Sequence, residues 1–289
     1  MTRREMLTGT AGLVAGVTLA RAPAGAAEPP PGGWKYSMCD WMLGRRANPS
    51  ALDLAREIGL DGVQVSVGTP EDKLHLRRPD MQKTYLDLAR KHGLVINSVA
   101  MGLLNDVPFA SEPKTALWAA DTIEVAKVLG ARNILLAFFG NGHLKESNAE
   151  DMRRVTECLQ ELAPRAEKAQ VVLGLETYLS AEAHLKILDQ VRSKWVQVYY
   201  DVYNAANPEH AGYDYLKEIR LLGADRICEV HFKEGGKFLG EGVIKWPEVA
   251  ATLKEVGYRG WITIEAGSPT RNVVADTRRN LAYLKKLFG

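Results

Sequence analysis

Cysteine is scarce in this chain of 289 residues, and neither sign of charge is in large excess. The three cysteines, Cys39, Cys158 and Cys228, are too few and too scattered for a disulfide framework or a thiolate zinc site. The 37 Lys and Arg residues nearly balance the 35 Asp and Glu residues, which argues against a dedicated binder of nucleic acid or anionic membranes. Ordinary contents of Gly (26) and Pro (13), with 46% hydrophobic residues, exclude a collagen-like or disordered chain and predict a packed core.

Residues 1–26 differ from the rest of the chain and are predicted to be an export signal. Arg3 and Arg4 precede an apolar run from Met6 to Ala20, which is shorter than the roughly 20 residues of a spanning helix. Ala24-Gly25-Ala26 then supplies small residues before a cleavage point. The pattern resembles the signal of the bacterial twin-arginine pathway, which exports folded proteins. It predicts a periplasmic or exported protein with no membrane contact after cleavage; a merely hydrophobic N-terminus and an uncleaved, anchoring leader are the alternatives.

The remaining chain is predicted to be a linker, residues 27–33, followed by one domain, residues 34–289. In that domain short apolar runs rich in β-branched residues alternate with longer amphipathic stretches of period 3.6. The expected strands are 35–39, 62–67, 94–100, 131–138, 171–176, 196–201, 227–232 and 261–265. The expected helices are 49–58, 79–92, 113–129, 149–169, 181–191, 213–222, 247–256 and 272–288.

Eight such units in about 260 residues predict an α/β fold, a single-domain (β/α)8 TIM barrel. Glycines such as Gly93 and Gly130 stand where the expected helices end, and prolines such as Pro79 stand where they begin. The alternative is an open, doubly wound sheet. No glycine-rich phosphate loop opens the first helix, which weakens a dinucleotide-binding interpretation.

Ionisable residues follow the apolar runs of the last four expected strands, at the barrel end where TIM barrels carry their chemistry. They are Glu176, Asp201, His231 and Glu265, spaced by 25, 30 and 34 residues, about one unit each. Carboxylates at close range repel one another unless a cation neutralises them. Oxygen ligands with one imidazole suit a single divalent ion, Mn²⁺ foremost, with Mg²⁺, Co²⁺ or Zn²⁺ as alternatives. Each residue taken alone could also be a solvated strand end or an ion-pair partner.

At these residues the sequence resembles the xylose isomerase-like barrels, which include sugar phosphate isomerases and epimerases, ketose 3-epimerases, hydroxypyruvate isomerases and inosose dehydratases. The resemblance rests on Gly-Leu-Glu176-Thr, Tyr-Tyr-Asp201-Val, Val-His231-Phe-Lys and Thr-Ile-Glu265-Ala, and on Leu-Gly-Glu-Gly before Trp246. It implies one divalent ion held by the four residues named above. It also implies that Glu176 and Glu265 exchange the proton next to a carbonyl from opposite sides, through a metal-stabilised enediolate.

Four further residues are candidates for substrate binding. Asn204 stands where ketose 3-epimerases usually have a histidine that helps to bind substrate. Lys233 alternates with His231 and is expected to face the barrel mouth, where it contacts either a substrate oxygen or a neighbouring carboxylate. His75 and His143 follow the second and fourth expected strands, and the alternative for both is a solvated loop position. No dense cluster of Arg and Lys is evident at the mouth, which argues against a phosphorylated substrate.

The leading functional prediction is a metal-dependent sugar isomerase or epimerase with a small carbohydrate or polyol substrate. A lyase or dehydratase acting on a keto-sugar or keto-inositol would use the same site, and a non-catalytic sugar-binding barrel is a further alternative. An endonuclease of the related abasic-site repair group is disfavoured, because only four strand-end ligands are clear and no basic stripe accompanies them. The resemblance also makes a homo-oligomer possible.

Overall fold

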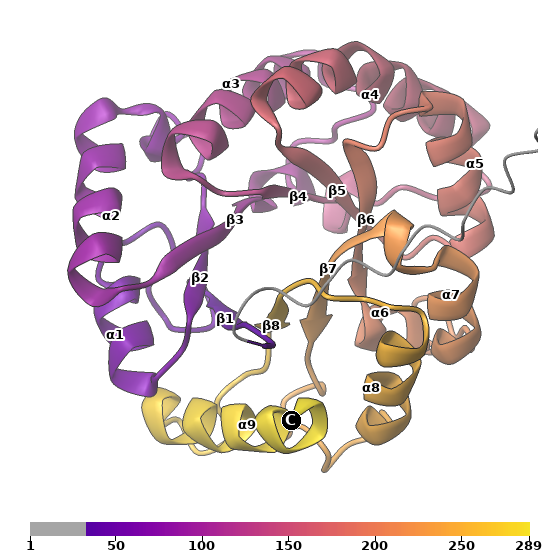
Figure 1. Ribbon diagram of the computed structural model, residues 1–289. Helices are drawn as coiled ribbons and strands as arrows, with labels where there is room; N and C mark the ends of the chain where they lie inside the picture. The colour runs from indigo at the N-terminus through magenta and orange to yellow at the C-terminus, as the bar shows by residue number, and fades with distance from the viewer. Residues whose placement is uncertain (1–32) are drawn as a thin grey trace, which may run out of the picture.

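The computed structural model describes residues 33–289, so the predicted signal (1–26) and all but the last residue of the predicted linker lie outside the described residues. Eight parallel strands close into one barrel in sequence order, with an outer ring of helices (Figure 1). The predicted single-domain (β/α)8 TIM barrel is therefore confirmed. The strands are β1 (Tyr36–Cys39), β2 (Gly62–Ser66), β3 (Val95–Met101), β4 (Asn133–Ala137), β5 (Val172–Glu176), β6 (Val196–Asp201), β7 (Ile227–Phe232) and β8 (Ile262–Ile264).

Helices follow the strands and cover the outside of the barrel. They are α1 (Ala51–Ile58), α2 (Pro79–His92), α3 (Lys114–Leu129), α4 (Ala149–Ala169), α5 (Ala181–Val191), α6 (Val202–Ala206), α7 (Tyr215–Leu222), α8 (Trp246–Glu255) and α9 (Val273–Phe288). Short 3-10 turns, among them η1 (His75–Arg77), lie in the connecting loops. The strands read as continuous apolar runs because one face packs against the helices and the other lines the barrel interior.

The predicted helix ends at glycine are confirmed. Gly93 and Gly130 adopt φ values of +64° and +71°, and their backbone N–H groups bond the last carbonyls of α2 and α3. Only glycine takes this left-handed conformation without a steric cost, so the residue type fixes where each helix stops.

One short helix is absent from the sequence-based prediction. The helix α6 (Val202–Ala206) begins directly after β6, and the Asp201 carboxylate accepts a hydrogen bond from the Asn204 backbone N–H at 2.8 Å. That bond caps the first turn and satisfies one of the amide groups that a helix leaves unpaired at its start. Asp201 therefore ends a strand and starts a helix at once, which fixes its backbone at the rim of the barrel.

A buried carboxylate, Glu229 of β7, lies inside the barrel below the strand ends. It accepts hydrogen bonds from five side chains: Asn97, Ser98, Asn133, Tyr199 and Thr263. Burying a charge without such partners is costly, so these donors compensate for its removal from water. The barrel floor is thus a hydrogen-bonded layer and gives the residues above it a fixed support. Within residues 33–289, no helix is long and apolar enough to cross a bilayer.

Candidate functional site

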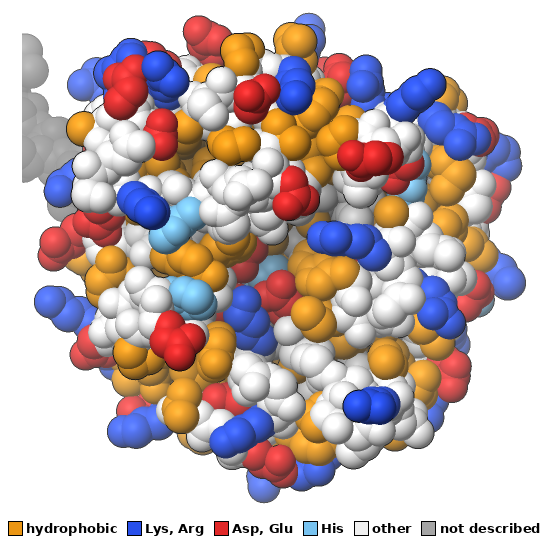
Figure 2. Space-filling model, turned by 180° about the vertical axis from the view of Figure 1, so that it is seen from behind, with side chains coloured by type: hydrophobic (Ala, Val, Ile, Leu, Met, Phe, Trp, Pro, Cys, Tyr) orange, Lys and Arg blue, Asp and Glu red, His pale blue; other side chains and the backbone are white. Residues whose placement is uncertain are grey.

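The four predicted ligands converge at one end of the barrel. Glu176 and Asp201 are the last residues of β5 and β6, His231 is the penultimate residue of β7, and Glu265 directly follows β8. In the β6–β7 pairing Asp201 stands opposite His231, so register as well as sequence position brings the side chains together. Figure 2 shows charged side chains and a histidine gathered in a hollow near the middle of this face of the molecule.

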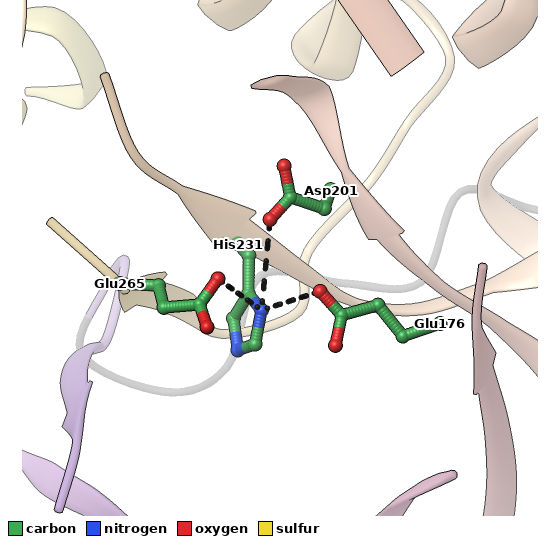
Figure 3. Close-up of side chains that lie close together, drawn as sticks. All are labelled: Glu176, Asp201, His231 and Glu265. Atoms are coloured by element: carbon green, nitrogen blue, oxygen red, sulfur yellow. Dashed lines mark hydrogen bonds and ion pairs between the residues drawn. The ribbon is translucent and has the colours of Figure 1, made fainter. Parts of the chain in front are cut away.

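The three carboxylates surround one ring nitrogen of the histidine (Figure 3). His231 Nδ1 lies 3.2 Å from Glu176 Oε1, 3.3 Å from Glu265 Oε2 and 3.9 Å from Asp201 Oδ2. One ligand atom from each residue lies within 4.8 Å of every other. Glu265 and Glu176 approach from opposite sides of the ring, with Asp201 between them. The cluster has the size and donor set of a mononuclear metal site.

The other ring nitrogen of His231 is held from below by a chain of hydrogen bonds. Gln64 Oε1 lies 2.9 Å from His231 Nε2, and the Gln64 amide donates to the Tyr199 hydroxyl at 2.9 Å. Tyr199 in turn donates to Glu229 at 2.5 Å. Because Glu229 can only accept when ionised, this order leaves the Gln64 oxygen as the acceptor and puts the imidazole proton on Nε2. In the neutral ring Nδ1 then carries the lone pair that can bind a cation.

Lys233 faces the same cluster. Its Nζ lies 2.9 Å from Asp201 Oδ2 and 3.0 Å from Glu265 Oε2, and the side chain is largely buried. The sequence left a substrate contact and a carboxylate partner as alternatives for this residue, and the structure shows the carboxylate contacts. Burial opposes the charged amine, but the carboxylates outweigh burial and raise the pKa of Lys233. The lysine is therefore a fixed positive charge at the site.

The surroundings drive the pKa values of the cluster apart. Burial, opposed by Lys233, raises the pKa of Asp201 to about 7. Burial also disfavours the charged form of Glu265, but Lys233 and His231 outweigh it and hold the pKa of that carboxyl well below its usual range. Burial disfavours the His231 cation too, but contacts that include Glu265 and Glu176 raise the pKa of the imidazole. Without a metal ion, bound protons and the Lys233 ammonium group offset the negative charge of the carboxylates.

One atom supports the metal interpretation directly. Asp201 Oδ2 is fully buried, and no hydrogen-bond donor is aligned with it even though Lys233 Nζ is close. Buried carboxylate oxygens are nearly always hydrogen-bonded, so this oxygen, held only by the ion pair with Lys233, can take a cation as a further partner. Glu176, Asp201, His231 and Glu265 would hold a hard or borderline divalent ion, for which carboxylate oxygen and imidazole nitrogen are suitable ligands.

A cleft lies beside the cluster. Its empty volume, open solvent included, is about 390 Å³, and Glu176 and Glu265 form part of its wall. The other lining residues are Trp41, Arg46, Ser66, Ala100, Gly102, Asn105, Leu135, Ala137 and Phe139. Trp41 Nε1 also donates to Glu265 Oε1 at 3.2 Å, which fixes one face of that carboxylate. An aromatic and aliphatic wall with a few converging polar groups is typical of small-molecule sites.

Comparison with known proteins agrees with this geometry. The sequence profile of the family described as "Xylose isomerase-like TIM barrel" matches residues 52–287. The chain belongs to this family. A curated relative in the same comparison is the L-ribulose-5-phosphate 3-epimerase UlaE of Escherichia coli (strain SMS-3-5 / SECEC), which is 28% identical over 239 residues, 76% of this chain and 82% of the relative.

Solved structures share the barrel. A D-psicose 3-epimerase crystallised in the presence of D-fructose superimposes with a TM-score of 0.71 at 15% identity, covering 88% of this chain and 99% of that one. The 3-keto-D-glucoside 4-epimerase YcjR of E. coli, in its apo form, has a TM-score of 0.70 at 15% identity, with 88% and 99% covered. At these identities the structures establish the fold. The curated relatives are named epimerases, and this xylose isomerase-like barrel is an enzyme of the isomerase and epimerase class.

The other predicted substrate-binding residues differ in their placement. Asn204 is buried at the cluster, where its amide lies 3.4 Å from Glu176 Oε1. His143 packs edge-on against Tyr178, with ring centroids 5.2 Å apart. His75 is buried in η1 beside Tyr85, and in the described part of the chain no hydrogen bond or ion pair joins it to the four-residue cluster. Their contact with substrate stays a prediction.

Sequence reasoning missed the residues that support the cluster from other elements. Gln64 lies within β2 and Tyr199 within β6, and each is a polar side chain directly after a buried valine. An isolated polar residue in a buried strand is a usable signal, because it needs a partner inside the barrel. Which partner it meets depends on the register around the closed sheet.

Proposed function

We propose that the protein is a divalent-metal-dependent sugar epimerase that abstracts and returns the proton on a carbon next to a carbonyl. The observation that carries the proposal is the placement of Glu176 and Glu265 on opposite sides of the His231 ring. Inversion at carbon requires an acceptor on one face of the substrate and a donor on the other. Two carboxylates facing each other across one cation site meet that requirement.

The roles follow from the contacts of each side chain. A bound ion would polarise the substrate carbonyl and stabilise negative charge that develops on its oxygen. Lys233 and His231 keep Glu265 ionised, so it can accept the substrate proton, although the same lowered pKa makes it a weak base. Glu176 would enter protonated and give its proton to the other face, which leaves Glu265 protonated and Glu176 ionised; the reverse reaction starts from that state with the roles exchanged. Carboxylates are weak bases for such protons, so positioning and charge stabilisation must supply most of the barrier reduction.

Lys233 and Asn204 would position the substrate beside this pair. The Lys233 ammonium can donate to a substrate oxygen when a divalent ion takes over its carboxylate partners. The Asn204 amide, 3.4 Å from Glu176 Oε1, can keep that carboxylate aimed at the cleft. We propose a neutral carbohydrate or polyol as substrate, because no dense basic cluster lines the cleft beside Glu176 and Glu265. We also propose export through the signal at residues 1–26, which N-terminal sequencing of the mature protein tests.

Solvent deuterium exchange tests the proposed reaction. The Mn²⁺-loaded protein is incubated in D₂O with ketoses, ring-ketone glycosides and inososes, and exchange is followed by NMR. We expect deuterium at one carbon, loss of exchange in Glu265→Gln and Glu176→Gln, and full exchange in Glu161→Gln, which changes an exposed residue of α4. A product lighter by one water would indicate the dehydratase alternative. Tight metal binding without exchange on any substrate would favour a binding protein and refute the proposal.

A further inference from the structure

A second hollow adjoins the cleft at the metal cluster. Its empty volume, open solvent included, is about 850 Å³, and it shares Arg46, Ser66 and Gly102 with the inner cleft. Its other lining residues are Ala47, Gly68, Thr69, Pro70, Glu71, Asp72, Leu103, Asp106 and Val107. The two spaces therefore meet along one wall, so a ligand that extends out of the inner cleft on this side enters the second space. We call the second space the outer pocket.

The wall of the outer pocket that follows β2 is built to a fixed shape. Gly68 has a φ of +115°, and a Cβ there would lie 2.5 Å from Asp72 Oδ1, so only glycine fits. The same Asp72 oxygen accepts hydrogen bonds from the backbone N–H groups of Thr69 at 2.9 Å and His75 at 3.0 Å. Lys73 and Leu74 are both left-handed, at φ values of 58° and 51°. Strained backbone held by local bonds is a feature of ligand-binding loops.

The charges around the outer pocket select the kind of ligand. Glu71, Asp72 and Asp106 contribute three carboxylates, against one guanidinium from Arg46. This excess of negative charge repels a phosphate or carboxylate group. Hydroxyl groups, by contrast, can donate to carboxylates and accept from a guanidinium. Arg46 is exposed and forms no ion pair with any residue between 33 and 289, so its donors stay available where the two spaces meet.

We propose that the substrate is a neutral glycoside carrying a ring ketone, and that the outer pocket binds the sugar linked to the reacting ring. The reacting ring occupies the inner cleft beside Glu176 and Glu265, and Arg46 donates to oxygens near the glycosidic bond. This assignment rests on the proposed epimerase function and names the substrate class that its site accepts. A free monosaccharide would leave the outer pocket empty. The phosphate group of a sugar phosphate would be repelled by the carboxylates of the outer pocket.

The test compares two substrates with the same reacting ring. One is a methyl keto-hexoside, and the other is a disaccharide containing that keto-hexose; kcat/KM for deuterium exchange is measured with Mn²⁺-loaded protein. Val107→Trp narrows the outer pocket, and Val128→Trp places the same bulk on the exposed end of α3. We expect the disaccharide to be preferred by tenfold or more, the scale of a filled subsite. Val107→Trp should remove that preference, and Val128→Trp should retain it.

A second measurement separates the subsite from the reaction. Calorimetric titration with the unoxidised disaccharide should show binding to the wild type that is at least tenfold weaker in Val107→Trp. Equal rates on both substrates, or equal binding to wild type and variant, would overturn the subsite. Disaccharide binding that Val107→Trp weakens, without exchange on either keto-substrate, would refute the epimerase function and keep the subsite. A substrate preference that survives Val107→Trp would also overturn the assignment to the outer pocket.

Discussion

Replacing Lys233 by methionine should tighten metal binding while weakening the metal-free protein. Lys233 Nζ lies 2.9 Å from Asp201 Oδ2 and 3.0 Å from Glu265 Oε2, where it occupies ligand oxygens of the proposed ion. Charges about 3 Å apart interact by about 5 kcal/mol at an effective dielectric constant of about 20, before desolvation is subtracted. Methionine keeps the apolar length of the side chain and removes only the charge. The cluster then becomes more negative by one unit.

Thermal denaturation separates the two effects of Lys233→Met, because the Tm should fall in the metal-free protein and recover when Mn²⁺ is bound. Removing one partner of a buried ion pair costs about 3–5 kcal/mol, which corresponds to roughly 10 °C in the Tm of a chain of this size. With Mn²⁺ the loss should be recovered, because the ion replaces the missing charge. One unit of charge near a divalent ion amounts to several kcal/mol at the same dielectric constant, so we expect Mn²⁺ to bind at least about tenfold more tightly.

The assay is a Mn²⁺ titration at about pH 8.5, above the pKa of about 7 that burial gives Asp201. Because Lys233 acts to lower the pKa of Asp201, its removal raises that pKa, and the high pH limits the protonation that would replace the lysine charge. Lys233→Arg is the matched control, since it keeps the charge and should keep the weaker binding. Equal or weaker Mn²⁺ binding in Lys233→Met would refute the idea that Lys233 competes with the ion. A rise in KM with little change in kcat would identify a further role in substrate binding.

Three other predictions concern the four-residue cluster and the residues near it. Gln64→Leu removes the acceptor that orients His231 and should weaken Mn²⁺ binding 10- to 100-fold by calorimetry; an unchanged affinity would contradict the positioning role. Because Asp201 is protonated below its pKa of about 7, Mn²⁺ binding must displace a proton there. The affinity should therefore fall as pH is lowered from 8 to 5, by up to about tenfold per unit, and a pH-independent affinity would speak against Asp201 as a ligand. Glu234 is buried and accepts hydrogen bonds from Trp246 Nε1 and the Ile244 backbone N–H. Glu234→Ala should lower the free energy of unfolding by about 2–4 kcal/mol in urea without changing Mn²⁺ affinity; a loss below about 0.5 kcal/mol would show that the bonds are unimportant.

The strands that carry the site could be predicted well from the sequence. The expected ranges 196–201 and 227–232 agree with β6 and β7, each a short run of mostly buried residues that ends close to a charged side chain at the rim. β8 is shorter than predicted, covering Ile262–Ile264, so Glu265 lies just beyond the strand rather than at its end. The short helix α6 was missed because five residues carry no amphipathic period.

The four candidate ligands could be predicted from the sequence, whereas the residues that hold them in place could not. Side chains at successive strand ends must meet at one rim of a closed parallel barrel, so spacing alone brings Glu176 and Glu265 together. Tyr199 and Glu229 are paired on the neighbouring strands β6 and β7, but the next link, from Tyr199 to Gln64 on β2, joins strands that are not neighbours. Sequence order does not determine such contacts, which depend on barrel closure and on which residues point inward. The position of Arg46 in the wall of both pockets likewise depends on the path of an irregular loop, which the sequence does not determine.

The most direct test of the central claim is a crystal structure of the Mn²⁺-loaded protein with an anomalous-difference map. We expect one ion per chain, contacting Glu176, Asp201, His231 and Glu265, with Lys233 displaced from its carboxylate partners. An ion at that position would confirm that the four strand-end residues form a metal centre between the two proposed proton-transfer groups. A map with no peak at the cluster, and Lys233 still paired with Asp201 and Glu265, would contradict it.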